Sequence, residues 1–192
     1  MNISNQLTIL RVIITFIFMF FLFGHGLIFK VLALVVFSLA CLTDYLDGFF
    51  ARKLKQISNF GIIMDPIADK ILVLGAFISF VEMEIIPAWM VVIVILRESL
   101  ITGLRIFSLG KGKVLKAERA GKHKTMSQMV TIVVILLYLI FKESGLKLKI
   151  WSEPLESKFS IFILALMGLT VILTTISGLS YLWQNRNLIS KE

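Results

Sequence analysis

Residues Asp44 to Asp69 read DYLDGFFARKLKQISNFGIIMDPIAD, and this run places four aspartates and Arg52 between strongly apolar segments. An ionised side chain in hydrocarbon costs about 3 kcal/mol or more, so the run requires partners such as metal ions. On a helix at about 100° per residue, Asp44 and Asp47 share one face, and Asp65 and Asp69 share another. The spacing therefore indicates two acidic helix faces that are able to meet.

The composition around this run is typical of an integral membrane protein. Of the 192 residues, 58% are hydrophobic and three are proline, and the mean hydropathy is +0.93. Such values lie far outside the usual composition of soluble domains. We therefore expect one membrane domain over residues 1–192 with an all-α fold.

Apolar stretches divide the chain into six expected transmembrane helices. Most of these stretches are not charge-free blocks of about 20 residues. Their charged ends lie towards one side of the membrane. The expected spans are 6–24, 28–51, 59–82, 86–109, 125–142 and 159–184. The shared polarity of their ends predicts an active site near one membrane surface.

The orientation follows from lysine and arginine, because segments rich in these residues resist translocation. With six spans, both termini lie on the same side. That side carries eleven bases, which are Arg52, Lys53, Lys55, Lys111, Lys113, Lys116, Arg119, Lys122, Lys124, Arg186 and Lys191. The opposite side carries five lysines diluted by five glutamates, which are Lys30, Lys142, Lys147, Lys149, Lys158, Glu82, Glu84, Glu143, Glu153 and Glu156. We therefore expect a multi-pass protein of the cell membrane whose termini and acidic run face the cytoplasm.

The net charge of +8 raises the alternative of nucleic acid as a partner. The bases lie in short loops beside the expected spans, however, and not on a separate folded module. Contact with anionic lipid headgroups or with a phosphorylated substrate fits this placement better. Cys41 is the single cysteine, so an intrachain disulfide and a multi-cysteine zinc site are both excluded.

The donor set of the acidic run predicts divalent metal ions. A cluster of carboxylates without histidine or cysteine suits Mg²⁺ or Mn²⁺, which prefer hard oxygen ligands. Four carboxylates from two helices are sufficient for two such ions, which neutralise phosphate charge and stabilise the attacking and leaving oxygens of a displacement at phosphorus. A fourth carboxylate that is less engaged in metal binding is suited to accept a proton. The predicted ligands are Asp44, Asp47, Asp65 and Asp69.

Small residues on the acidic faces leave space for a ligand. Gly48, Ala51 and Gly61 allow helix backbones to approach closely, and we expect them to line that space. Arg52 follows one turn after Gly48 and is suited to a phosphate or pyrophosphate through its fork of donors. Pro66 removes an amide donor, which indicates either a kink or a helix start at the preceding aspartate.

These residues spell the pattern DxxDGxxAR, then eight residues, then GxxxDxxxD, which resembles the CDP-alcohol phosphatidyltransferase family. The pattern is matched without a gap by Asp44, Asp47, Gly48, Ala51, Arg52, Gly61, Asp65 and Asp69. The resemblance implies a six-helix membrane fold, usually a homodimer. It also implies transfer of a phosphatidyl group from a CDP-linked lipid to an alcohol, with release of CMP.

The resemblance further implies roles for individual residues. The first three aspartates of the pattern correspond to metal ligands, and Asp69 corresponds to a shared ligand and the general base. The positions that accommodate the CDP portion are matched by Gly48, Ala51, Arg52 and Gly61. Near the start of the first expected span, Thr8 and Arg11 are candidates for contact with the nucleotide. For Arg11, snorkelling to the membrane interface is an equal alternative.

A second block, Arg97 to Gln128, reads RESLITGLRIFSLGKGKVLKAERAGKHKTMSQ. Together with NQLTILRV near the N-terminus, it resembles the bacterial phosphatidylglycerolphosphate synthase branch of the same family. That resemblance implies CDP-diacylglycerol as the lipid donor and glycerol 3-phosphate as the acceptor. Within the block, Arg97 and Glu98 either form an internal ion pair that fixes helix packing or belong to the acceptor site.

An acceptor that carries a dianionic phosphate needs concentrated positive charge near the metal site. The candidates for this contact are Arg105, Lys113, Lys122 and Lys124. These bases alone do not separate glycerol phosphate from inositol phosphate, and serine or phosphatidylglycerol are further acceptors within the family. A divalent-cation transporter is the rival from another class, because aspartates within the membrane also mark ion pathways. Its expected site lies near the midplane between repeated halves, whereas these carboxylates form one run near the cytoplasmic helix ends.

Overall fold

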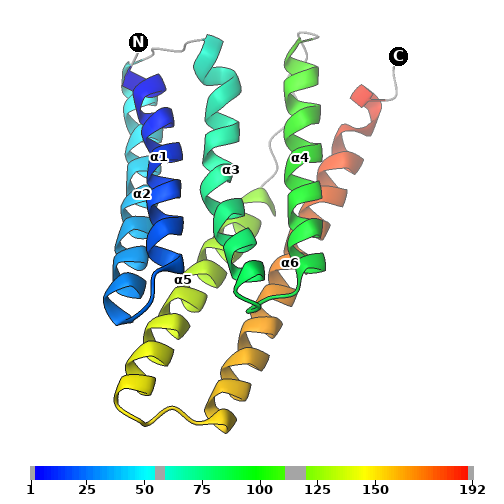
Figure 1. The fold of residues 1–192 in the computed structure, drawn as a ribbon. Coiled ribbons are helices and arrows are strands. Elements are labelled where there is room, and N and C mark those ends of the chain that lie inside the picture. The colour runs from blue at the N-terminus through cyan, green and yellow to red at the C-terminus, as the bar shows by residue number, and fades with distance from the viewer. Residues whose placement is uncertain (1–2, 55–58, 111–119, 190–192) are drawn as a thin grey trace.

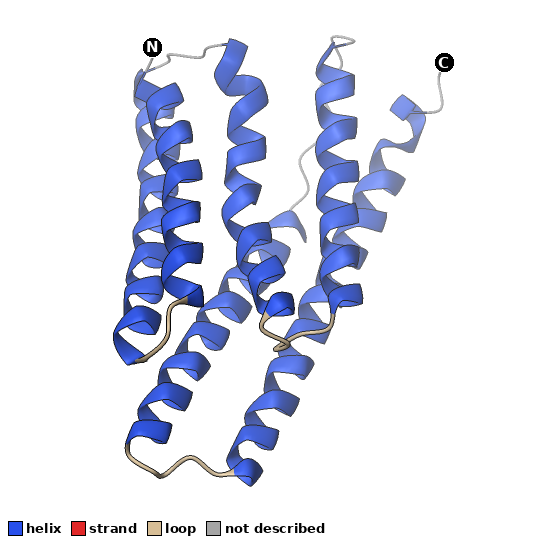
Figure 2. Ribbon diagram, viewed as in Figure 1, coloured by secondary structure: helices blue, strands red, loops and turns tan. Residues whose placement is uncertain are grey.

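The computed structural model describes the chain at residues 3–54, 59–110 and 120–189, and its side chains at residues 9–43, 70–108, 110 and 123–186. Over these residues the fold is all-α, with six helices and no strand (Figure 2). The helices are α1 Ile3–Phe23, α2 Leu27–Leu54, α3 Asn59–Glu82, α4 Ala88–Gly110, α5 Ala120–Lys147 and α6 Glu153–Ile189.

Each expected span overlaps one of these helices, so the all-α fold is confirmed over the described residues. The span 6–24 ends one residue beyond α1, and the span 86–109 begins two residues before α4. The helices α5 and α6 extend beyond the expected spans 125–142 and 159–184 at both ends. Polar residues continue a helix readily because its backbone hydrogen bonds do not depend on an apolar face. Pro66 lies inside α3, which begins at Asn59, so the alternative of a helix start at Asp65 is wrong.

The six helices form one bundle in which the helix ends near the acidic run gather together. Both termini, the end of α2 and the start of α3 lie at the upper end of the molecule in Figure 1. The helix α1 packs against α2 and α3, while α6 packs against α4 and α5. Further contacts join α3 to α4 and α5, and α2 to α5. Helices from both halves of the chain therefore surround α3.

A short glycine-containing turn connects α1 to α2 at the other end of the bundle. Gly26 has a φ of +94°, in the left-handed region that side chains rarely adopt. The ammonium of Lys30 donates hydrogen bonds to the carbonyl oxygens of Leu22 at 2.6 Å and Gly24 at 2.9 Å. A cation at the end of α1 satisfies carbonyls that the helix leaves unpaired and complements its dipole.

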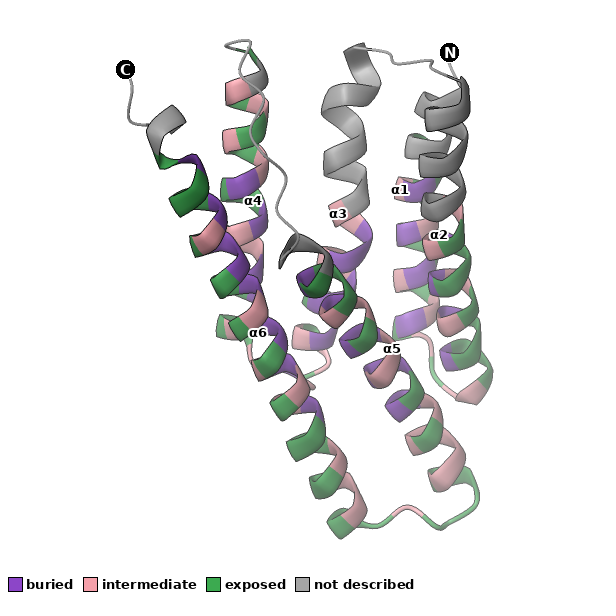
Figure 3. Cartoon of the chain, turned by 180° about the vertical axis from the view of Figure 1, so that it is seen from behind, coloured by how far each residue is buried: buried purple, intermediate pink, exposed green. Residues whose placement is uncertain are grey.

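The bundle has a packed interior and an apolar exterior. Phe18 of α1 and Phe37 of α2 are buried with their ring centroids 5.6 Å apart, and Phe77 of α3 is fully buried. In contrast, Phe16 of α1 is 66% exposed and Trp183 of α6 is 70% exposed. Exposed residues occur along the outer faces of the helices in Figure 3. Many large apolar side chains exposed in this way are costly in water and fit contact with lipid.

The length and composition of two helices also fit a membrane protein. Among the described residues, His123–Lys147 of α5 and Glu153–Arg186 of α6 are long and apolar enough to cross a membrane. Shorter apolar segments cover Ile9–Phe23 of α1 and Leu27–Thr43 of α2. These segments and the exposed apolar side chains are consistent with a membrane protein.

Truncation of the interior should cost far more stability than truncation of the exterior. We expect Phe77→Ala to lower the free energy of unfolding by about 3–5 kcal/mol, because the cavity left behind closes only partly. Phe16→Ala is the matched control, since its ring is mostly exposed on the neighbouring helix. Thermal melting of both variants in detergent checks this, and equal losses of melting temperature would contradict the assigned interior.

Candidate functional site

The acidic pattern lies on two consecutive helices at the end of the bundle that carries both termini. Asp44 and Asp47 lie in the last three turns of α2, and Asp65 and Asp69 lie in the first three turns of α3. Only residues 55–58 separate the two helices, so their ends lie within about 18 Å of each other. The helices thus bring all four positions to one end of the molecule. The pattern side chains Asp44, Asp47, Gly48, Ala51, Arg52, Gly61, Asp65 and Asp69 lie outside the described residues, as does that of Thr8.

Directly after Asp69, the chain enters a buried polar network. Lys70 of α3 has a side chain that is 25% exposed, and its ammonium lies 3.9 Å from the carboxylate of Glu98 on α4. The same ammonium donates a hydrogen bond to the hydroxyl of Thr102, one turn further along α4. Two contacts from α4 therefore orient the side chain that follows the last aspartate of the pattern.

The carboxylate of Glu98 is the centre of this network. Its side chain is only 4% exposed, and it accepts hydrogen bonds from Arg97 at 3.2 Å and from the ammonium of Lys124 on α5. A buried carboxylate is strongly destabilising unless its charge is paired and its lone pairs are satisfied. We call Lys70, Arg97, Glu98 and Lys124 the Glu98 cluster. It contains three cations and one anion.

The helix α6 joins the Glu98 cluster through Arg97. The guanidinium of Arg97 donates a hydrogen bond to the hydroxyl of Ser177 at 2.8 Å. Its aliphatic stem lies beside Gly178, where a Cβ atom would come within 2.9 Å of the Arg97 Cγ. The predicted ion pair between Arg97 and Glu98 is therefore confirmed, and the Glu98 cluster with Ser177 links four helices.

A cavity of about 220 Å³ opens between α3 and α4 beside the Glu98 cluster. It lies immediately next to the last aspartate of the acidic pattern in the chain. Its lining is polar on the α4 side and largely apolar on the α3 side. The lining residues are Lys70, Ile71, Leu74, Glu98, Ser99, Thr102 and Gly103.

The predicted binding residues whose side chains are described differ in burial. Arg11 of α1 is buried, on a helix that contacts both α2 and α3. Arg105 is exposed near the end of α4, whereas Lys124 is buried against Glu98. Lys113 lies outside the described residues, and Lys122 lies on α5 with a side chain that is not described. The structure thus brings Lys124 together with Glu98 and Lys70.

Sequence reasoning missed Lys70 as a member of this site. The available signal was its position one residue after Asp69, followed by a stretch of α3 that carries no other charged residue before Glu82. One step along a helix turns the side chain by about 100°, away from the acidic face. The sequence alone does not say which helix that direction meets, and the structure identifies it as α4.

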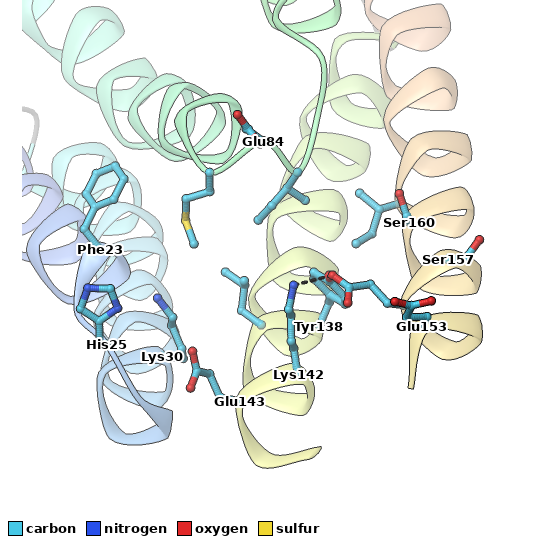
Figure 4. A pocket seen from close by; sticks show the side chains of 15 residues that line it. Phe23, His25, Lys30, Glu84, Tyr138, Lys142, Glu143, Glu153, Ser157 and Ser160 are labelled. Carbon is cyan, nitrogen blue, oxygen red and sulfur yellow. Dashed lines mark hydrogen bonds and ion pairs between the residues drawn. The ribbon is translucent and has the colours of Figure 1, made fainter. Parts of the chain in front are cut away.

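A second cavity, of about 830 Å³, lies at the other end of the bundle (Figure 4). His25, Glu84 and Glu153 come to it from the turns or helix starts at that end. Lys142 forms an ion pair with Glu156, which also accepts a hydrogen bond from the Trp151 indole at 3.1 Å. Where side chains are described, no group of three or more His, Cys, Asp or Glu residues is placed to hold a metal ion. The predicted metal ligands belong to α2 and α3 near the opposite end of the bundle.

Comparison with known proteins identifies the family of this chain. The sequence model of the CDP-alcohol phosphatidyltransferase family matches residues 1–176. The chain belongs to this family.

Similarity to individual phosphatidyltransferases extends over most of the chain. A CDP-diacylglycerol–glycerol-3-phosphate 3-phosphatidyltransferase of Bacillus subtilis is 34% identical over 196 residues, which cover 96% of this chain and 95% of the Bacillus protein. A protein of the same name from Wigglesworthia glossinidia brevipalpis is 38% identical over 144 residues, covering 71% of this chain and 77% of that protein. A third protein of this name, from Cereibacter sphaeroides, is 36% identical over 140 residues, which cover 71% of this chain and 63% of that protein.

Within this phosphatidyltransferase, the contact between Arg97 and α6 predicts a sensitive position at Gly178. We expect Gly178→Ala to destabilise the protein by about 1–3 kcal/mol, because the new methyl group displaces the stem of Arg97. Gly168→Ala on the same helix is the control, since a Cβ atom there meets nothing within 4 Å. Melting temperatures in detergent compare the two variants, and a Gly178→Ala variant as stable as Gly168→Ala would contradict the close packing.

Proposed function

We propose that this chain transfers the phosphatidyl group of CDP-diacylglycerol to glycerol 3-phosphate, which gives phosphatidylglycerol phosphate and CMP. The observation that carries this proposal is the similarity to the Bacillus enzyme over almost the full length of both chains. The gathering of the acidic pattern on α2 and α3 at one end of the bundle supports the same chemistry. The reaction would supply an anionic phospholipid.

Divalent metal ions fit the donor set of the proposed active site. Four carboxylates without sulfur or imidazole donors suit Mg²⁺ or Mn²⁺, and two helices at one end of the bundle provide them. The residues proposed to hold two ions are Asp44, Asp47, Asp65 and Asp69. When bound, such ions would neutralise phosphate charge and stabilise the oxygens that attack and leave the phosphorus.

The chain itself would bind the substrates and move the proton. Gly48, Ala51 and Gly61 leave room for the CDP portion, and Arg52 provides a planar fork of donors for its phosphates. Thr8 and the buried Arg11 belong to α1, which contacts both helices of the acidic pattern. We assign them to the nucleotide side of the site.

Asp69 is the proposed general base. It would accept the proton of the primary hydroxyl of glycerol 3-phosphate as that oxygen attacks the lipid-side phosphorus and CMP leaves. The proposed contacts to the acceptor phosphate are Arg105, Lys113, Lys122 and Lys124. Of these, Lys124 is close to the α3 helix that carries Asp69, because it shares Glu98 with Lys70.

The proposed membrane arrangement has all six helices crossing the bilayer, with both termini in the cytoplasm. Eleven bases near the termini and their connecting segments support this orientation through the positive-inside effect. The apolar exterior of the bundle supports lipid contact. The active site would then lie near the cytoplasmic surface of the cell membrane, where a lipid substrate and a water-soluble acceptor meet. The homodimer is proposed from the family resemblance.

An acceptor competition tests the proposed reaction. Purified protein is given CDP-diacylglycerol with glycerol 3-phosphate, inositol phosphate, serine and phosphatidylglycerol, and the lipid product is identified by mass. We expect phosphatidylglycerol phosphate as the main product, formed only with Mg²⁺ or Mn²⁺ and abolished by excess chelator. Cardiolipin as the product would overturn the acceptor, and full activity in chelator would overturn the metal requirement.

Replacement of the proposed base should affect the chemical step more than substrate binding. We expect Asp69→Asn to lower kcat by about 100-fold or more, because the amide does not accept the proton. CMP binding should weaken far less, as measured by calorimetry. Glu82→Gln removes the same charge at the far end of the same helix and serves as the control. A near-normal kcat for Asp69→Asn would remove this residue as the base.

A further inference from the structure

The Glu98 cluster lies at the same depth in the bundle as the proposed general base. Lys70 follows the start of α3 by 11 residues, and Glu98 precedes the end of α4 by 12 residues. At a rise of about 1.5 Å per residue, both lie about 17 Å from the bundle end that carries the termini. Lys70 is also the residue after Asp69. The cluster therefore adjoins the proposed site of proton transfer.

We propose that Glu98 is a positioning residue that holds the ammonium groups of Lys70 and Lys124 towards the phosphate of the acceptor. This inference rests on the proposed function. Glu98 contacts a cation from α3 and a cation from α5, two helices that the chain joins only through α4. Its carboxylate fixes both ammonium groups relative to the helix that carries Asp69.

The charge of the Glu98 cluster favours a dianionic ligand. Its three cations exceed its single carboxylate by two positive charges. Glu98 is the one carboxylate within this cluster, so the cluster itself carries a net positive charge. An acceptor phosphate with two negative charges complements it, and the 220 Å³ cavity provides space beside Lys70 and Thr102.

A role limited to holding helices together explains the cluster less well. Buried ion pairs contribute little net stability, because desolvation of the charges offsets their attraction, and apolar residues of similar volume often stabilise as much. Ionisable residues between membrane helices are costly and mark functional sites. The chain also contains a comparison pair, Lys142 and Glu156, whose side chains are 33% and 41% exposed at the opposite end of the bundle. That pair avoids most of the desolvation cost.

Removal of the carboxylate charge should release the cations from each other. In Glu98→Gln, Lys70 and Lys124 lose the carboxylate that both contact, so their ammonium groups are no longer held towards the acceptor phosphate. We therefore expect the KM for glycerol 3-phosphate to rise about tenfold or more, while the KM for CDP-diacylglycerol stays within about twofold. A defect that only loosens the fold would alter both KM values or lower the fraction of active protein.

Two further variants complete the test. Glu98→Asp keeps the charge but shortens the side chain, so it should fold like the wild type and give an intermediate KM for glycerol 3-phosphate. If Glu98→Gln does not fold, the test uses the KM of Glu98→Asp for glycerol 3-phosphate instead. Glu156→Gln breaks the ion pair at the opposite end of the bundle and should leave both KM values unchanged.

Calorimetry separates the proposed acceptor from the positioning role of Glu98. It measures the binding of glycerol 3-phosphate and of inorganic phosphate to the wild type and the variants. If the wild type forms no phosphatidylglycerol phosphate but Glu98→Asp still weakens phosphate binding, the proposed acceptor fails and the positioning role stands. If Glu98→Asp and every folded Glu98 variant keep wild-type phosphate binding and a KM within twofold, the positioning role is overturned. Equal rises in both KM values would also overturn it.

Discussion

A charged group between apolar helices needs a partner, because hydrocarbon offers neither hydrogen bonds nor counter-charge. The described part of this phosphatidyltransferase satisfies that constraint at Glu98, which cations from three helices contact. At the other end of α5, Lys142 and Glu156 satisfy it in a more exposed setting. The four aspartates of α2 and α3 impose the same constraint more severely, and in the proposed function two divalent ions meet it. One physical requirement thus links the fold to the chemistry.

The bundle divides its surface according to this requirement. Apolar side chains such as Phe16 and Trp183 cover the outside, while charged side chains are held between helices or placed at the helix ends. Because α3 lies among α1, α4 and α5, neighbouring helices cover most of the side chains of Lys70 and Ser79. A reaction that joins a membrane lipid to a water-soluble phosphate requires such an arrangement, in which polar groups are available at one end and the exterior stays apolar.

Much of the fold was predictable because the signals are local. Six apolar stretches became six helices, and the spacing of the aspartates placed them on helices α2 and α3. Helix ends were less predictable, since polar turns extend α5 to Lys147 and α6 from Glu153 beyond the apolar residues that define a span. Arg97 and Glu98 allowed two interpretations in the sequence. Their ion pair depends on Ser177 and Gly178 of α6, about 80 residues away, and no local pattern encodes that contact.

The sequence by itself determined the helical membrane architecture, the acidic pattern and the membership of the family, because periodicity and residue spacing act within single helices. Only the tertiary structure decided that Lys70, Glu98 and Lys124 meet. These residues come from α3, α4 and α5, and the partners Glu98 and Lys124 are 26 positions apart in the sequence. Which helix faces pack together depends on the shapes and volumes of all the side chains in the bundle at once. The arrangement of cations beside the proposed active site therefore depends on how the whole bundle packs.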